Sequence, residues 1–131
     1  MDDKPRVLVV DDEKDFIELF VNRFRKRNLD VSGVDSGYAA LDFLAQSPVD
    51  VIVLDVRMPG IDCIETLKEI KKRHPAVEVI MLTGHGSVES GLQGMSYGAY
   101  DYIMKPFAID DLLERINKAF ERKQLSEKRG G

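Results

Sequence analysis

Carboxylates and a lysine follow several short apolar runs of this sequence. Asp11 and Asp12 come directly after the run Arg6 to Val10, Asp55 ends the run VIVLD, and Lys105 follows YIM. Unshielded carboxylates about 4 Å apart repel by roughly 4 kcal/mol at an effective dielectric near 20, so such a group needs a cation. Mg2+ prefers carboxylate oxygens and often completes its shell with water and a phosphate. We therefore expect the three carboxylates to bind Mg2+, with Lys105 as a separate positive charge for a phosphoryl oxygen.

Asp55 is the candidate nucleophile of this set. It stands alone at the end of the most apolar run, whereas Asp11 and Asp12 are adjacent and suit joint metal binding. The hydroxyl of Thr83, which follows another apolar run, can donate to a second phosphoryl oxygen. A nucleophile, a metal and preorganised donors are the parts of a phosphoryl-transfer site. A single aspartate at a strand end more often caps a helix or forms a turn, so the prediction depends on the combination with Lys105.

The elements that must position these residues are short apolar runs, which alternate along the chain with segments in which apolar residues recur at helical spacing. Short runs rich in β-branched residues predict five strands, at Arg6 to Val10, Val31 to Asp35, Val51 to Leu54, Val77 to Leu82 and Asp101 to Met104. Helical spacing recurs after the strands, clearly at Phe16, Phe20 and Phe24 and most weakly over Ser87 to Tyr97. Strands that are apolar on both faces and alternate with helices predict a doubly wound α/β domain with a parallel sheet. Such sheets bind ligands at the carboxyl ends of their strands, where the candidate residues lie.

Length and charge narrow the class of protein. The chain has 131 residues, 44% of them hydrophobic, which suits one compact domain. Its formal charge of −4 argues against a protein that mainly grips nucleic acid. No apolar run approaches the roughly 18 residues of a membrane span, and the start MDDKPRV is charged, so we expect a cytoplasmic protein without membrane contact. Cys63 is the only cysteine, which leaves no internal disulfide, and we expect it to pack as a small hydrophobe.

Four ordered motifs, VLVVDDE, VIVLDVRMPG, IMLTGHG and GAYDYIMKPF, closely resemble the receiver domain of the response regulators of two-component signalling. The resemblance covers about Pro5 to Arg122. It implies a flavodoxin-like (βα)5 sandwich with strand order 2-1-3-4-5. We therefore expect a receiver domain over residues 1–122, followed over 123–131 by an extension of the last helix or the start of a linker.

The resemblance also implies roles for the acidic residues. Asp55 would accept a phosphoryl group from the phosphohistidine of a sensor histidine kinase or a histidine phosphotransfer protein. Asp12 and Asp55 would bind Mg2+ directly, Asp11 through water, and the backbone carbonyl of Arg57 would complete the protein ligands. The protein would catalyse its own phosphorylation and dephosphorylation without turning over a separate metabolite, so it would not be an enzyme in the usual sense.

Further implied roles concern the response to phosphorylation. Thr83 and Lys105 would bind the phosphoryl oxygens, and Tyr102 matches the family's switch aromatic, which turns inward when Thr83 moves toward the phosphate. This movement would repack the predicted fourth helix and fifth strand and so control an output. The same face, together with the fifth helix, is the expected surface for a phosphorylation-dependent homodimer.

Several residues beside the site carry separate hypotheses. The side chains of Arg57 and His85 would set the lifetime of the acyl phosphate. Gly91 and Gly94 lower the helix propensity of the predicted fourth helix, which is then either close to melting or closely packed against a neighbour. The Lys105–Pro106 bond is expected to be cis. A surface for docking the kinase is expected at Phe16, Leu19, Arg23, Pro106 and Phe107.

Other classes of protein share parts of this pattern. Phosphatases of the haloacid dehalogenase type also use an aspartate nucleophile with Mg2+ and a lysine, but they need a second acid two residues later, where Arg57 stands. A flavin carrier or a nicotinamide-binding domain needs a phosphate-cradling loop after the first strand, and Asp11-Asp12-Glu13 would repel phosphate there. TGHG and GAYDYIMKPF also resemble the receivers of enhancer-binding transcription activators. The chain could therefore be a stand-alone receiver or the N-terminal receiver of a larger transcription regulator, although we expect no DNA-reading element within it.

Overall fold

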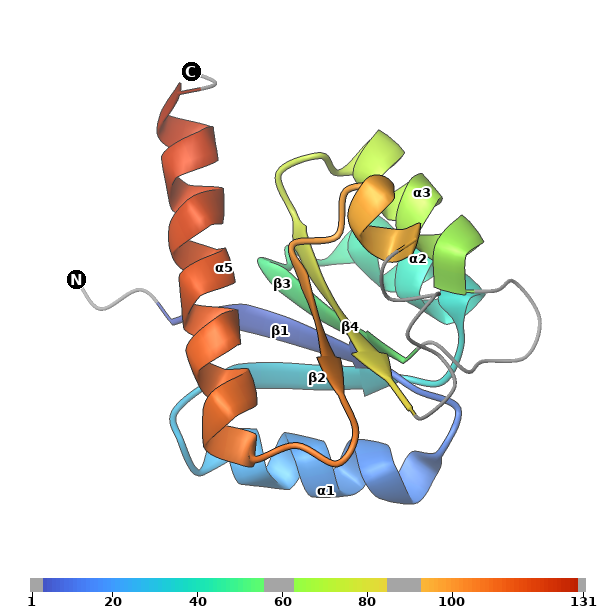
Figure 1. The fold of residues 1–131 in the computed structure, drawn as a ribbon, viewed down its shortest axis with the longest axis vertical. Helices are drawn as coiled ribbons and strands as arrows, with labels where there is room; N and C mark the ends of the chain where they lie inside the picture. Colours follow the sequence, from blue (N-terminus) through green and yellow to red (C-terminus); the bar gives the residue numbers. More distant parts are fainter. Residues whose placement is uncertain (1–3, 56–62, 85–92, 130–131) are drawn as a thin grey trace.

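The computed structural model describes residues 4–55, 63–84 and 93–129, without the side chains of the last two. A five-stranded sheet lies between two layers of helices (Figure 1). A short helical stretch, residues 93–96, lies between β4 and β5. In chain order the other elements are β1 (Arg6–Val10), α1 (Lys14–Arg25), β2 (Asp30–Val34), α2 (Gly37–Gln46), β3 (Val51–Asp55), α3 (Cys63–Arg73), β4 (Glu78–Thr83), β5 (Asp101–Met104) and α5 (Ile109–Arg129).

The strands are parallel and lie in the order β2-β1-β3-β4-β5, which confirms the predicted fold and strand order. β1 and β5 have the predicted bounds, whereas β3 ends one residue later than predicted, at Asp55. β4 begins one residue later than predicted, because the N–H of Val77 donates to the carbonyl of His74 in the preceding turn at 3.0 Å. Thr83 is therefore the last residue of β4. β2 begins one residue earlier than predicted, because Asp30 pairs with Arg6 across the ladder.

Two hydrophobic clusters, one on each face of the sheet, hold the strands. Val7 and Val9 of β1 belong to the cluster beneath α1 and α5, whereas Leu8 and Val10 belong to the cluster beneath α2 and α3. This alternation follows from the two-residue period of a strand. All residues of β3 and β4 are buried. Packing on both faces therefore fixes the carboxyl ends of the central strands.

Gly94, in the helical stretch 93–96, packs closely against Met81 of β4. A Cβ atom at this position would come within 2.0 Å of Sδ of Met81, which is fully buried. This distance supports the close-packing explanation for Gly94. Gly91 lies outside the described residues, and faster amide exchange around Gly94 than in α3 remains the test of a helix close to melting.

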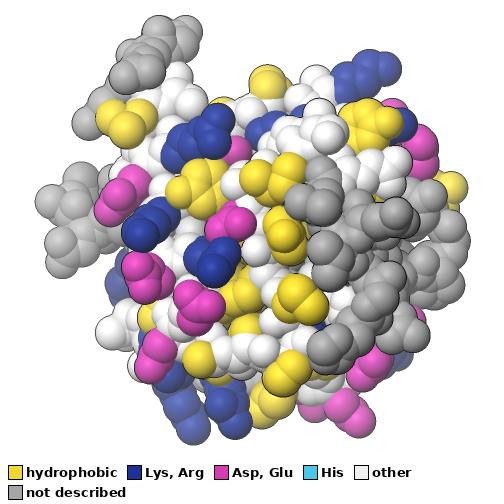
Figure 2. All heavy atoms as spheres, in the orientation of Figure 1, with side chains coloured by type: hydrophobic (Ala, Val, Ile, Leu, Met, Phe, Trp, Pro, Cys, Tyr) yellow, Lys and Arg dark blue, Asp and Glu magenta, His cyan; other side chains and the backbone are white. Residues whose placement is uncertain are grey.

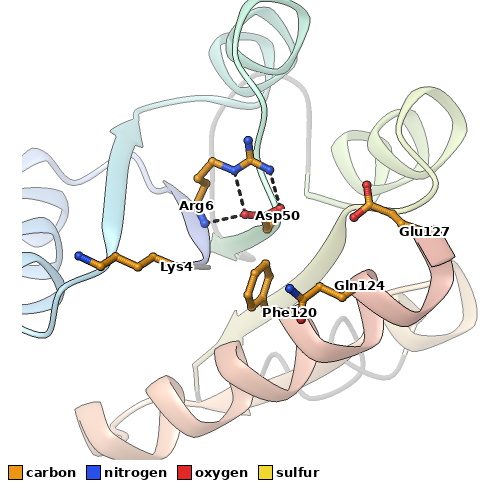
Figure 3. Close-up of a pocket in the computed structure, with 6 residues that line it drawn as sticks. All are labelled: Lys4, Arg6, Asp50, Phe120, Gln124 and Glu127. Atoms are coloured by element: carbon orange, nitrogen blue, oxygen red, sulfur yellow. Dashed lines mark hydrogen bonds and ion pairs between the residues drawn. The ribbon is translucent and has the colours of Figure 1, made fainter. Parts of the chain in front are cut away.

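Asp50, just before β3, is a buried carboxylate at the opposite edge of the sheet from the acidic motifs. It accepts hydrogen bonds from the backbone N–H of Arg6 at 2.8 Å and from two guanidinium nitrogens of Arg6 at 2.9 Å each (Figure 3). Nζ of Lys123 on α5 lies 3.0 Å from Asp50 Oδ1, and the Lys123 side chain is 8% exposed. Burial acts to raise the pKa of Asp50, but the hydrogen bonds from Arg6 and Lys123 outweigh burial. The pKa of Asp50 therefore lies below its usual value.

Glu78 of β4 is a second buried carboxylate at this edge. Its carboxylate lies 3.4 Å from Nζ of Lys71 on α3 and 3.2 Å from Nε of Arg122 on α5. The guanidinium of Arg122 also lies 5.6 Å from the centroid of the Tyr100 ring. The consecutive cations Arg122 and Lys123 thus attach the later turns of α5 to β4 and to the residue before β3.

No helix in the described ranges is long and apolar enough to cross a membrane.

Candidate functional site

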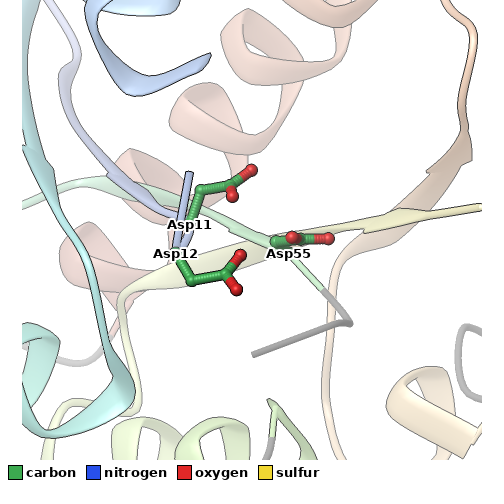
Figure 4. Close-up of side chains that lie close together, drawn as sticks. All are labelled: Asp11, Asp12 and Asp55. Atoms are coloured by element: carbon green, nitrogen blue, oxygen red, sulfur yellow. The ribbon is translucent and has the colours of Figure 1, made fainter. Parts of the chain in front are cut away.

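Asp11, Asp12 and Asp55 converge at the carboxyl ends of β1 and β3 (Figure 4). Asp55 is the last residue of the buried strand β3 and is 4% exposed. Asp11 is 1% exposed, and its backbone N–H donates to the carbonyl of Val34 at 3.1 Å, which fixes the turn after β1. One carboxylate oxygen from each of the three lies within 4.8 Å of the others. Residues far apart in the sequence therefore form one acidic cluster.

Asp11 supplies an observation that favours a cation in this cluster. Its Oδ1 accepts the backbone N–H of Glu13 at 2.9 Å, whereas its buried Oδ2 has no hydrogen-bond partner within the described residues. Burial raises the pKa of Asp11 to about 6, and the charge of Asp55 contributes to that increase. A buried, unpaired oxygen beside two other carboxylates fits a hard divalent cation such as Mg2+.

Lys105 brings a positive charge to the cluster from the loop after β5. Its Nζ lies 3.4 Å from Asp55 Oδ1 and 4.9 Å from the centroid of the Phe16 ring. Its backbone N–H donates to the carbonyl of Thr83 at 2.7 Å. The Lys105–Pro106 bond is cis, as expected. The ammonium therefore faces the candidate nucleophile.

Thr83 and Tyr102 lie on the two neighbouring strands β4 and β5. The Thr83 side chain is fully buried, and its Oγ1 donates to the carbonyl of Ile103 at 3.5 Å, a long hydrogen bond. Tyr102 is half-buried and packs against the hydrophobic cluster beneath α2 and α3. Thr83 pairs with Met104 across the ladder, so Tyr102, two residues before Met104, lies on the same face of the sheet as Thr83.

The predicted docking residues share one apolar pocket of about 310 Å3 beside Lys105. Leu19, on its rim, is 50% exposed. The pocket is lined by Phe16, Leu19, Phe20, Arg23, Lys105, Pro106, Phe107 and Ile109.

Three other residues named from the sequence lie apart from this pocket or outside the described residues. Arg57 and His85 lie outside the described residues. Cys63, the first residue of α3, is buried as expected.

Sequence reasoning missed two contacts that the structure shows. One is the contact of Lys105 with the Phe16 ring, and the other is the pairing of Asp50 with Lys123. Each joins side chains from elements that are distant in the chain. Asp50 stands directly before an apolar strand, and an acid at the start of a buried strand is the one signal that could have indicated a buried ion pair.

Asp11→Asn is expected to stabilise the metal-free protein at pH 7.5 by about 1–3 kcal/mol. The folded pKa of Asp11 is raised from 3.8 to about 6, so its charge reduces stability progressively as the pH rises from about 4 to about 6. Asparagine keeps the acceptor for Glu13 and removes that charge. Urea unfolding in EDTA at pH 4 and pH 7.5 measures the effect. Equal stabilities of the variant and the wild type at pH 7.5 would show that the charge of Asp11 does not reduce the stability of the fold.

A sequence model of the response regulator receiver domain matches residues 7–117. The chain belongs to this family, whose members are phosphoryl-accepting signalling switches. The match removes the support for a phosphatase of the haloacid dehalogenase type.

Named relatives agree with this assignment. The chain is 34% identical over 116 residues to the DNA-binding transcriptional regulator NtrC of Klebsiella pneumoniae, a match that covers 88% of this chain and 25% of that protein. It is 36% identical over 121 residues to a putative NtrX-like response regulator of Rickettsia bellii, covering 91% of this chain and 25% of that protein. The chain thus spans about a quarter of the length of these regulators.

Solved structures show the same fold. The receiver domain of the Francisella response regulator 1452 superposes with a TM-score of 0.83 at 35% identity, covering 91% of this chain and 98% of that one. NtrX from Brucella abortus superposes with a TM-score of 0.89 at 31% identity, covering 98% of this chain and 29% of that one.

Proposed function

We propose that Asp55 is the residue of this receiver that accepts the phosphoryl group, in a reaction that depends on Mg2+. The observation that carries the proposal is the convergence of the acidic cluster and Lys105 at one sheet edge, where a buried oxygen of Asp11 has no hydrogen-bond partner in the part of the chain that the structure describes. Mg2+, held by the three carboxylates and the backbone carbonyl of Arg57, would neutralise charge on the transferring phosphoryl group.

The proposed transfer runs from a phosphohistidine to the carboxylate of Asp55. An Asp55 oxygen attacks phosphorus, an O–P bond forms, and the P–N bond to the imidazole breaks. The leaving nitrogen takes up a proton, and an acyl phosphate remains on Asp55. Lys105 supplies a positive charge 3.4 Å from the nucleophile, and the buried strand β3 holds that nucleophile in place.

Thr83 and Tyr102 are proposed to convert phosphorylation into a change of shape. The Thr83 hydroxyl gives up only a long hydrogen bond to Ile103 if it turns toward a phosphoryl oxygen. Space vacated beside β5 would then admit the ring of Tyr102. Arg57 and His85 remain the residues predicted to set the lifetime of the acyl phosphate, and an unchanged dephosphorylation rate after replacing both would contradict that role.

The apolar pocket beside Lys105 is proposed to dock the kinase or phosphotransfer protein. Leu19→Ala is expected to slow transfer from the cognate kinase about tenfold, because an exposed anchor at the pocket rim is lost. Transfer from acetyl phosphate, which needs no docking, is the control and should be unchanged. Measuring the initial rate of each reaction separates them, and a normal rate from the kinase would remove the docking role.

The face that contains β5 and α5 is proposed to carry the output. Figure 2 shows hydrophobic side chains interspersed with acidic and basic ones on this face. Met104 of β5 is exposed, as are Met95 and Tyr97 in the segment before β5. Arg115 of α5 forms an ion pair with Asp101 of β5. This mixture suits a phosphorylation-dependent homodimer that opens and closes. We propose that the receiver occupies residues 1–122 and that residues 123–131 extend the last helix or begin a linker, within a longer cytoplasmic transcription regulator like its relatives.

Incubation with acetyl phosphate tests the proposed function. In Mg2+ the protein is expected to gain the mass of one phosphoryl group. In EDTA the yield of this adduct should be at least tenfold lower, because the acidic cluster is then left unneutralised. Intact mass measurement reads both reactions, with Ca2+ in place of Mg2+ as a control for charge without the same coordination geometry. A chain that gains no mass in Mg2+ would contradict the proposal.

A further inference from the structure

Three phenylalanines one turn apart form a ladder along α1. The ring centroids of Phe16 and Phe20 are 5.0 Å apart, and those of Phe20 and Phe24 are 4.6 Å apart. Phe20 and Phe24 are buried, whereas Phe16 is half-buried at the end nearest the acidic cluster. Packing along the ladder restrains the Phe16 ring, because each ring limits the rotation of the next.

The loop after β5 contacts this ladder at two points. Phe107 packs against Phe20 with centroids 6.0 Å apart, and Nζ of Lys105 lies 4.9 Å from the centroid of Phe16. The same Nζ lies 3.4 Å from Asp55 Oδ1. The ammonium of Lys105 is thus held between an aromatic ring and the candidate nucleophile.

We propose that Phe16 is a positioning residue for Lys105, an inference that rests on the proposed function of Asp55. A lysine side chain has four rotatable bonds and loses conformational freedom when its ammonium is fixed. The negative face of an aromatic ring attracts that ammonium and reduces the freedom left to lose at the moment of transfer. The Lys105 side chain is 32% exposed, so the contact acts in partly solvated surroundings, where a two- to fivefold effect on rate is expected.

This role is distinct from docking a kinase at the same pocket. Leucine at position 16 would keep an apolar surface for a protein partner but would offer no ring face to the ammonium. A small phosphodonor makes no use of the docking pocket. The rate of reaction with phosphoramidate in Mg2+ therefore reports the positioning role alone.

The test compares Phe16→Leu and Phe16→Tyr with chains that carry mono-, di- and trifluorinated phenylalanine at position 16. Fluorine withdraws charge from the ring face and changes its shape little. The rate constant with phosphoramidate should fall stepwise with fluorination, by two- to fivefold overall, fall similarly in Phe16→Leu, and return in Phe16→Tyr. The same fluorinated residues at Phe24, which lies two turns from Lys105 along α1, are the matched control and should leave the rate unchanged.

A spectroscopic measurement completes the test. The ε-methylene protons of Lys105 should show an upfield ring-current shift that Phe16→Leu removes, which a purely structural role for Phe16 does not require. If the wild-type chain is phosphorylated and every variant at position 16 reacts at the same rate, the inference is overturned and the proposed function stands. A wild-type chain that takes no phosphoryl group would overturn the proposed function itself.

Discussion

Asp55→Asn is expected to abolish the phosphoryl adduct that the wild-type chain forms with acetyl phosphate and Mg2+. The amide has no anionic oxygen to attack phosphorus, and it removes one of the three carboxylates of the acidic cluster. The residue ends a fully buried strand and is 4% exposed, so asparagine fits the same space. The expected loss in rate is at least about 100-fold, measured by intact mass after timed incubation.

Asp35→Asn is the matched control for that variant. Asp35 follows β2 at the same edge of the sheet but is exposed, and it is not part of the acidic cluster. Asp35 directly precedes Ser36, the N-cap residue of α2. Oγ of Ser36 accepts the N–H of Ala39 at 3.1 Å. This variant should gain the phosphoryl group at the wild-type rate. An adduct of wild-type yield in Asp55→Asn would show that another residue is the acceptor.

Asp50→Ala is expected to lower the free energy of unfolding by about 3–5 kcal/mol at pH 7. Asp50 is 2% exposed and pairs with both Arg6 and Lys123, so alanine removes the partner of two cations and of a backbone N–H. Lys123, itself only 8% exposed, keeps its contact with Glu127 at 3.0 Å. Urea unfolding followed by circular dichroism measures the change.

The exposed pair of Arg27 and Asp110 provides the control for this effect. Their atoms lie 3.2 Å apart, but the Asp110 side chain is 84% exposed. Asp110→Ala should therefore change the free energy of unfolding by less than about 1 kcal/mol. Similar losses in Asp50→Ala and Asp110→Ala would mean that burial of the Asp50 pair contributes little to the stability of the fold.

The convergence of the candidate residues was predictable because the approximate carboxyl ends of the strands were. Asp11, Asp55 and Lys105 each follow an apolar run, and parallel strands bring such positions to one edge whatever the details of side-chain packing. The strand bounds were wrong by one residue at both ends of β2 and β4 and at the end of β3. The ladder pairing of Asp30 with Arg6 and the turn hydrogen bond from Val77 to His74, and not hydrophobicity, decide where β2 and β4 begin.

Contacts between side chains from distant elements were not predictable in this way. The pairing of Asp50 with Lys123 depends on the rotation of α5 against the sheet, and that rotation is set by core packing. The contact of Lys105 with Phe16 depends on the path of the loop after β5. An aromatic residue at helical spacing is usually read as core, and Phe16 fits that pattern as well as the role proposed for it.

The central claim is that Asp55 carries the phosphoryl group, and chemical trapping tests it most directly. Borohydride reduces an acyl phosphate to an alcohol, so a phosphorylated aspartate becomes homoserine. Wild-type protein treated with acetyl phosphate and Mg2+, reduced and digested, should contain homoserine at position 55 when its peptides are sequenced by mass spectrometry. Homoserine at Asp11, at Asp12 or at any other position, with unmodified aspartate at position 55, would contradict the account.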